Sequence, residues 1–135
     1  MVAEGRQACV YNRLECGVHE LILAEASREM VDELLVHMTA IHGSAAPGER
    51  LRVLVDSRML GLPPVAYLFQ RVRQWLMSEP APNPGQVAFL LGDITLVWLV
   101  DSLLKTILRG MDVTVRFFDS SERDEAVIWL LSKES

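Results

Sequence analysis

Three apolar runs constrain the fold of this chain more than any other feature of its sequence. They occupy residues 52–56, 87–93 and 113–119, and each ends at an aspartate and is followed by a segment of helical periodicity. Strands that are buried on both faces of a parallel sheet read as such near-continuous apolar runs, and the crossover between parallel strands is usually a helix. The runs therefore predict an α/β domain with a mostly parallel sheet.

The start of the chain predicts an antiparallel margin to this sheet. Residues 10–15 and 18–24 carry β-forming side chains in partial alternation on either side of Gly17, as in a hairpin. With the apolar runs, this hairpin predicts the order β-β-α-β-α-β-α-β-α, with about five strands and four helices in a mixed sheet. Residues 1–9 are expected to form a flexible N-terminus and residues 10–132 a single domain.

Capping residues and prolines predict where the helices begin. Ser27 is a typical N-cap and is followed by an apolar stripe of helical period. The proline pair at 63–64 favours the first turn of a second helix. The third helix is expected to start at an Asp93 cap, and the last at a cap on Ser120 or Ser121.

Composition and charge exclude several classes of partner. The 135 residues carry a net charge of −5, whereas non-specific binding to nucleic acid requires clustered Lys and Arg. The most hydrophobic region, residues 87–108, contains Asp93, Asp101 and Lys105, which a bilayer span would have to bury. Since no secretory signal is visible near Met1, we expect a cytoplasmic protein that neither binds nucleic acid nor spans a membrane.

The cysteines and histidines match no metal or redox motif. The spacing of Cys9 and Cys16 fits neither a zinc site nor a thioredoxin-type pair, and His19, His37 and His42 provide no adjacent ligand set. No cofactor or metal is therefore expected. In a reducing cytosol both cysteines should remain thiols, with a response to oxidants left open.

The ends of the apolar runs form the first candidate site. Ligands of open α/β sheets bind beyond the carboxyl ends of the strands, so Asp56, Ser57, Asp93 and Asp119 would share one edge and hold Mg²⁺ or a phosphate group. The simpler interpretation is that Asp93 and the serines after Asp119 cap helices. Ser57, expected to be an exposed hydroxyl just after a strand, is also a candidate for phosphorylation.

Exposed aromatic residues form the second candidate site. Trp98 is expected on the polar side of the third helix, next to Leu99, and Tyr67 on the outer side of the second helix. Aromatic residues are enriched at protein interfaces, and exposed apolar patches mark contact surfaces. The surface around Trp98 is therefore predicted to mediate self-association, with a partly covered edge residue as the alternative.

The order of segments resembles the anti-anti-sigma group, also called STAS or SpoIIAA-like domains, and especially its bacterial members. The resemblance covers residues 10–132. It rests on LRVLVD at 51–56, followed by a loop and a helix, and on FFD at 117–119 with EAVIWL at 125–130. It implies a SpoIIAA-like α/β fold and a non-enzymatic module that binds a protein, a lipid or a small ligand.

One motif of that group does not carry over. Its members place a phosphorylated serine or threonine at the start of the helix after the first of these strands, where this chain has Leu62, Pro63 and Pro64. Ser57 lies several residues too early. The expected function is thus a non-enzymatic regulatory or interaction module that forms a homodimer. The alternative is a small-ligand, phosphate or Mg²⁺-binding domain, or an enzyme, that uses the acids at the strand ends.

Overall fold

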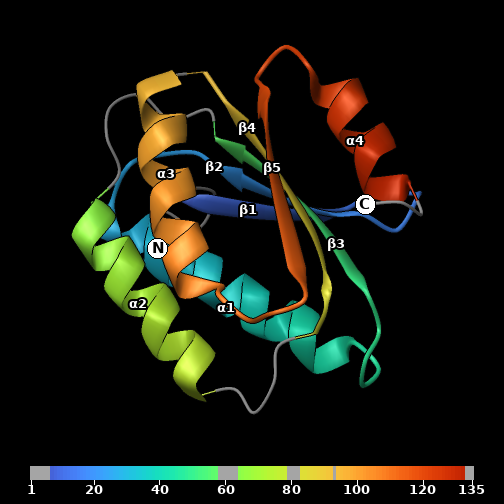
Figure 1. The fold of residues 1–135 in the computed structure, drawn as a ribbon, viewed down its shortest axis with the longest axis horizontal. Helices are drawn as coiled ribbons and strands as arrows, with labels where there is room; N and C mark the ends of the chain where they lie inside the picture. The colour runs from blue at the N-terminus through green and yellow to red at the C-terminus, as the bar shows by residue number, and fades with distance from the viewer. Residues whose placement is uncertain (1–6, 58–63, 79–82, 93, 133–135) are drawn as a thin grey trace.

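The computed structural model describes residues 7–57, 64–78, 83–92 and 94–132 (Figure 1). Its strands are β1 (Cys9–Arg13), β2 (His19–Leu23), β3 (Leu51–Ser57), β4 (Gly85–Leu91) and β5 (Val113–Asp119). Its helices are α1 (Arg28–Ser44), α2 (Val65–Ser78), α3 (Ile94–Ile107) and α4 (Arg123–Leu131). The predicted α/β class and element order are confirmed.

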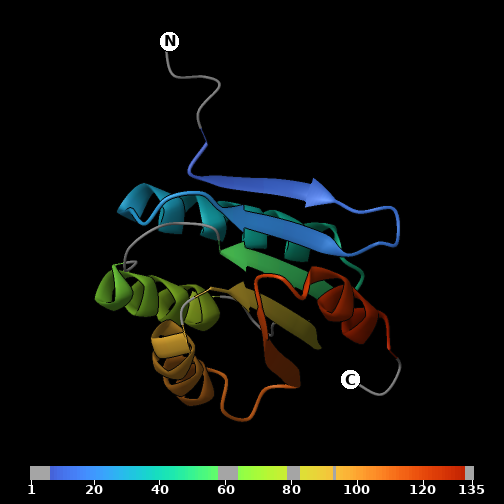
Figure 2. The ribbon, with the colours of Figure 1, turned by 90° about the horizontal axis from the view of Figure 1, so that it is seen from above.

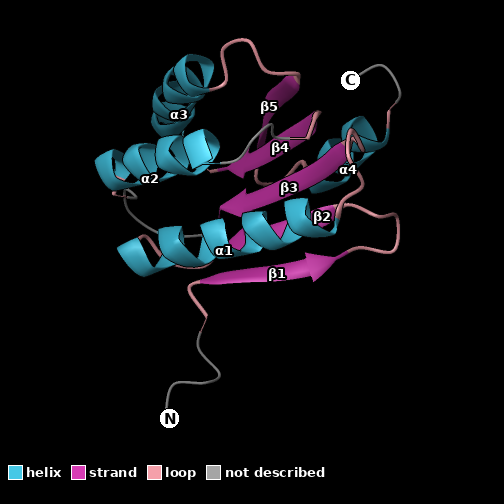
Figure 3. Cartoon of the chain, turned by 90° about the horizontal axis from the view of Figure 1, so that it is seen from below, coloured by secondary structure: helices cyan, strands magenta, loops and turns pink. Residues whose placement is uncertain are grey.

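The five strands of the described sheet lie in the order in which they occur along the chain, β1-β2-β3-β4-β5. β1 is antiparallel to β2, and every other neighbouring pair is parallel. Because crossovers between parallel strands are right-handed, this order places α1, α2 and α3 on one face of the sheet. α4 packs on the other face, against β3, β4 and β5 (Figures 2 and 3).

Local signals set the first turns of the fold as expected. Gly17 takes a φ of 91° in the hairpin turn, a left-handed conformation that glycine adopts without a steric penalty. The Ser27 side chain accepts a hydrogen bond of 3.1 Å from the backbone N–H of Met30 and so caps α1. The carbonyl of Pro64 accepts a bond from the N–H of Leu68 at the start of α2.

Two expected features are wrong, and one lies outside the described residues. Ser57 is the last residue of β3 and is buried, because it is still paired with Leu23 of β2 in the sheet. The N-cap of α4 is Glu122, whereas Ser121 donates hydrogen bonds to Asp119 in the turn before the helix. The expected Asp93 cap of α3 lies outside the described residues.

The core consists of two layers of aliphatic side chains, one on each face of the sheet. The layer under α1 and α2 includes Leu21, Met30 and Val53, and the layer under α4 includes Leu54 and Leu130. At about 25 cal/mol per Å² of apolar surface removed from water, such side chains dominate the stability of the domain.

Burial is uneven among the helices that cover the first face. α1 contains four buried residues, Met30, Val31, Leu35 and Ile41. α2 contains none, and the described side chains of α3 include none either. The two helices therefore stand over the sheet without closing fully onto it.

Candidate functional site

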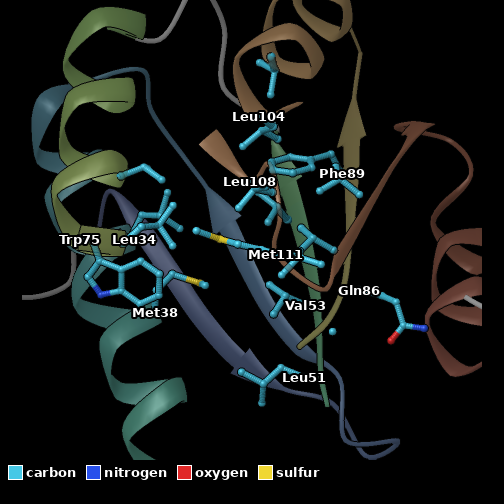
Figure 4. Close-up of a pocket in the computed structure, with 18 of the residues that line it drawn as sticks. Leu34, Met38, Leu51, Val53, Trp75, Gln86, Phe89, Leu104, Leu108 and Met111 are labelled. Carbon is cyan, nitrogen blue, oxygen red and sulfur yellow. The ribbon is translucent and has the colours of Figure 1, made fainter. Parts of the chain in front are cut away.

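An apolar cavity of about 200 Å³ lies between the sheet and helices α1, α2 and α3 (Figure 4). Its floor is built by the side chains of β3, β4 and β5 that point toward these helices. In a strand every second side chain shares a face, so the floor of β3 consists of Leu51, Val53, Val55 and Ser57. The parallel register continues this surface across the sheet.

Two rows of paired residues show how the register builds the floor, although Phe117, at the end of the second row, does not itself line the cavity. Val53 is paired with Val87, and Val87 with Val115. Phe89 is likewise paired with Phe117, and their rings stack with centroids 5.4 Å apart. The rows present only aliphatic and aromatic carbon to the cavity.

The roof of the cavity comes from the three helices. α1 contributes Leu34 and Met38, α2 contributes side chains that include Leu68, Val72 and Trp75, and α3 contributes Val100 and Leu104. Leu108 and Met111, which follow α3, complete it. Trp75 is held in place because its indole N–H donates a bond of 2.9 Å to the Thr39 hydroxyl.

The described lining contains no Asp, Glu, Lys or Arg side chain; its polar residues are His42, Ser57, Asn83 and Gln86. The amide nitrogen of Asn83 is already bonded to the carbonyls of Ala46 and Glu49, at 2.9 Å each. The Gln86 side chain points away from the cavity, toward α4 (Figure 4). A guest in this cavity would thus meet hydrocarbon on almost every side.

The volume is large enough for a small organic molecule. An engineered apolar cavity of roughly 150 Å³ is known to stay dry and to bind benzene or xenon. The cavity of about 200 Å³ in this protein exceeds that size and has the same kind of lining. Chemically, the arrangement can bind an apolar molecule.

The predicted acidic edge does not gather its members within the described residues. Asp56, Leu90 and Phe118 lie in register across three strands, and Asp119 comes one residue later. Because side chains alternate along a strand, Asp56 and Asp119 leave opposite faces of the sheet. No group of three or more His, Cys, Asp or Glu side chains in the described part of the chain is placed to hold a metal ion.

Asp56 instead belongs to a buried charge cluster under α4. The side chains of Asp56 and Glu20 are 3% and 5% exposed, and both contact the Arg123 guanidinium. The distance to Asp56 is 3.5 Å, and Glu20 also accepts a bond of 3.1 Å from the Asn12 amide. The cluster ties the first turn of α4 to β2 and β3.

Asp119 is exposed and is bonded locally. It accepts hydrogen bonds from the Ser121 hydroxyl and from the Ser121 backbone N–H, and both bonds lower the pKa of its carboxyl. Its structure is that of a turn residue before a helix. Ser121 thus holds Asp119, whereas Arg123 contacts Asp56.

The cysteines and two of the histidines lie around β1. Cys9 is buried, and burial, followed by the nearby Glu33 carboxylate, raises the pKa of its thiol to about 12. Cys16 is exposed, and both are free thiols. His19 shares a hydrogen bond of 2.7 Å with the Tyr11 hydroxyl, and burial lowers the pKa of His19.

The predicted aromatic surface is divided. Trp98 is 72% exposed on α3, and Leu99 beside it is half-buried. Tyr67, expected on the outer side of its helix, is half-buried and donates a bond of 2.6 Å to Asp32 on α1. The guanidinium of Arg28 lies 4.9 Å from its ring centre. Tyr67 thus helps to join α1 and α2.

Sequence reasoning missed the cavity and the role of Arg123. The sequence does contain a signal for the cavity. Residues 94–108 are apolar on almost every side of the helix, and the sheet can cover only one of these sides, so apolar surface is left over. Arg123 has no comparable signal, since its partners Glu20 and Asp56 are far away in the sequence.

Comparisons with protein-family models, with curated protein sequences and with solved structures found no match to this chain. The resemblance to the anti-anti-sigma group therefore stays a prediction. None of the helices in the described ranges has the length and apolar character needed to cross a membrane.

Proposed function

We propose that this protein is a non-enzymatic binding module whose cavity between the sheet and α1, α2 and α3 takes up an apolar ligand. The observation that carries the proposal is the cavity of about 200 Å³, whose described lining is almost entirely hydrocarbon. Ligand pockets are typically concave and mostly apolar, with few polar groups. Because α2 and α3 do not close fully over the sheet, they leave apolar surface that such a ligand can cover.

The placement of the polar groups supports binding rather than chemistry. Asp56 and Glu20 are engaged by Arg123 in the interior, and Asp119 is engaged by Ser121. These contacts give the three acids structural partners, and none of the three lines the cavity. A module that binds a ligand and signals its presence requires no catalytic group.

Kinship with the anti-anti-sigma group is part of the same proposal. The N-terminal hairpin and the alternation of strands and helices in a mostly parallel sheet agree with the fold that the resemblance implies. In this proposal the module is regulatory, and the occupied cavity takes the place of the phosphorylated hydroxyl that the chain lacks.

Uptake of an uncharged fluorescent probe, N-phenyl-1-naphthylamine, tests the proposal. The native protein should raise the fluorescence of the probe, and Leu104→Trp, which adds a large side chain to the roof, should abolish the rise. Thr106→Trp, which adds the same side chain on an exposed position of α3, should keep it. Circular dichroism checks that both variants fold. The proposal would be overturned if the folded native protein did not raise the fluorescence of the probe. It would also be overturned if both variants lost the rise to the same extent.

Self-association through α3 is a second candidate function, favoured by the exposure of Trp98. An indole that is 72% exposed on a helix is a typical anchor for a partner surface. Light scattering coupled to size-exclusion chromatography should show a dimer for the wild type and a monomer for Trp98→Ala. A wild type that stays monomeric at high concentration would remove this candidate.

The third candidate is a Mg²⁺ or phosphate site that uses Asp56, Ser57, Asp93 and Asp119. It is the least supported, because Asp56 and Asp119 leave opposite faces of the sheet. A ligand that binds only the native state must raise the unfolding temperature. Thermal unfolding with millimolar Mg²⁺ or phosphate should therefore show no shift if the acids are structural.

A further inference from the structure

We infer that β5 is the surface through which two copies of this chain pair, as antiparallel strands about a two-fold axis at Val115, so that their sheets join into one. The inference goes beyond the proposed function, because it does not involve the occupant of the cavity. It also names a surface other than that around Trp98. The observations behind it are the open backbone groups of β5 and the register that they allow.

β5 is one of the two edge strands of the described sheet, on the side opposite to β1 (Figures 2 and 3). The N–H of Gly85 donates a bond of 3.0 Å to the carbonyl of Asp112, so the even-numbered residues of β5 turn their backbone groups toward β4. The N–H and C=O groups of Val113, Val115 and Phe117 therefore point outward, and no described residue bonds to them there. Such a row of open groups is a template for another strand.

Other outward groups at the sheet edges are closed. The N–H of Asp119 donates a bond of 2.8 Å to the Glu122 carboxylate, and its carbonyl accepts one of 2.8 Å from the Glu122 N–H. On β1, the N–H of Cys9 donates a bond of 2.9 Å to Glu33, and its carbonyl accepts one of 3.1 Å from the His37 ring. The open groups of β5 thus end at Asp119.

These open groups match a second copy of themselves. A two-fold axis perpendicular to the sheet reverses the strand direction, so two β5 strands meet antiparallel. With Val115 of each copy on the axis, Val113 lies opposite Phe117 of the second copy. The three N–H and three C=O groups of each copy then form six hydrogen bonds, and the pairing stops where Asp119 is closed.

The neighbouring register is less favourable. With Arg116 on the axis, two arginine side chains would face each other, and like charges directly opposite destabilise a pair of strands. Val113 would also face Asp119, whose backbone groups are already bonded. With Val115 on the axis, Arg116 instead faces Thr114, and Val113 faces an aromatic ring, which is a favourable cross-strand pair. This self-complementarity favours a second copy over an extended segment of another protein.

Light scattering coupled to size-exclusion chromatography tests the inference. The wild type should be a dimer. Val115→Pro removes the N–H at the axis from each copy and should raise the dissociation constant of the dimer at least about tenfold. It should keep the monomer fold, because proline is tolerated where the N–H points away from the sheet, and circular dichroism checks this. Trp98→Ala should remain a dimer.

Exposed substitutions test the register without changing the backbone. Thr114→Lys places a like charge opposite Arg116 of the second copy and should weaken the dimer at least about threefold, whereas Thr114→Glu should strengthen it at least about threefold. The matched controls are Thr106→Lys and Thr106→Glu, at an exposed position of α3, and they should change the dissociation constant by less than about twofold.

A single cysteine locates the axis. In a Cys16→Ser background, Val115→Cys places two thiols opposite each other with Cα atoms about 5.5 Å apart, within the range of a disulfide. Val113→Cys places them four residues apart along the strands, because each lies opposite Phe117, and the distance of about 13 Å is too long. Diamide should cross-link the first variant and not the second, since the native Cys9 is buried.

Three results would overturn the inference. The first is a wild type that stays monomeric at high concentration, in which case the open edge suits an extended segment of another protein. The second is a folded Val115→Pro that dimerises as tightly as the wild type; loss of the dimer in Trp98→Ala would then place the interface on α3. The third is cross-linking of Val113→Cys without that of Val115→Cys. None of these results bears on uptake of the fluorescent probe, so the proposed function is tested separately.

Discussion

Replacing Arg123 by methionine is the sharpest test of the interior that holds α4 on the sheet. The guanidinium contacts two carboxylates whose side chains are 5% and 3% exposed, those of Glu20 and Asp56. Methionine keeps most of the aliphatic stem of the arginine and removes only the charge and its hydrogen bonds. The variant therefore leaves two buried negative charges close together without the cation between them.

The expected loss of stability follows from this geometry. Removing one partner of a fully buried ion pair costs about 3–5 kcal/mol, because the other charge stays buried without compensation. The Arg123 side chain is 34% exposed, so water screens part of the interaction and we expect about 2–3 kcal/mol. Glu20→Gln in the Arg123→Met background should recover part of the loss, because it removes one of the two like charges.

Urea unfolding at neutral pH, followed by tryptophan fluorescence, measures the effect by linear extrapolation. The matched control is Lys105→Met, which breaks an ion pair of 3.0 Å with Asp101 on the surface of α3 and should change stability by no more than about 0.5 kcal/mol. If Arg123→Met loses no more than Lys105→Met, the acids are not held by Arg123.

Three further predictions concern the backbone, the thiols and a histidine. Gly85→Ala would press a Cβ against the carbonyl oxygen of Leu51 in β3 and should lower the unfolding free energy by about 1–3 kcal/mol. Gly43 lies in α1 with open space around it, so Gly43→Ala should raise the unfolding free energy by up to about 1 kcal/mol. Urea unfolding measures both, and a harmless Gly85→Ala would contradict the close strand approach. At about pH 8 a thiol reagent should label Cys16 in the folded protein but Cys9 only after unfolding, because burial raises the Cys9 pKa to about 12. Mass spectrometry counts the labels, and rapid labelling of both cysteines in the folded protein would refute this prediction. Because burial lowers the His19 pKa below its ordinary value of 6.5, the unfolded state binds more protons there, so stability should fall as pH drops through 6.5 toward the folded pKa. His19→Gln should remove that part of the slope between about pH 7.5 and about pH 5.5, and an unchanged slope would count against the assignment.

The parts of the fold that sequence reasoning predicted are those with local signals. The cap at Ser27 and the turn at Gly17 depend only on residues within a few positions, and both are confirmed. The apolar runs that became β3, β4 and β5 also carry their signal within themselves. The mostly parallel sheet with the hairpin as its antiparallel margin was predicted and is confirmed, whereas the order of the strands within the sheet was not predicted.

The parts that failed depend on residues far away in the sequence. Ser57 reads as a loop residue, but it lies beside Leu23 of β2 in the register and is buried there. Asp56 reads as a free acid at a strand end, but Arg123 lies 67 positions later. The apolar character of residues 94–108 is a local signal for uncovered apolar surface, but the cavity also depends on how far α2 and α3 stand from the sheet.

The agreement between strand order and chain order has a consequence for how the polypeptide assembles. Each parallel strand pairs with the strand that precedes it in the chain, so no strand of the described sheet requires pairing between segments that are separated by another strand. Loop-closure entropy is smallest for such near-neighbour pairings, which favours rapid folding for a sheet of this kind. The helix that carries Arg123 comes after the last strand, and its docking brings the countercharge to acids that earlier strands have already placed.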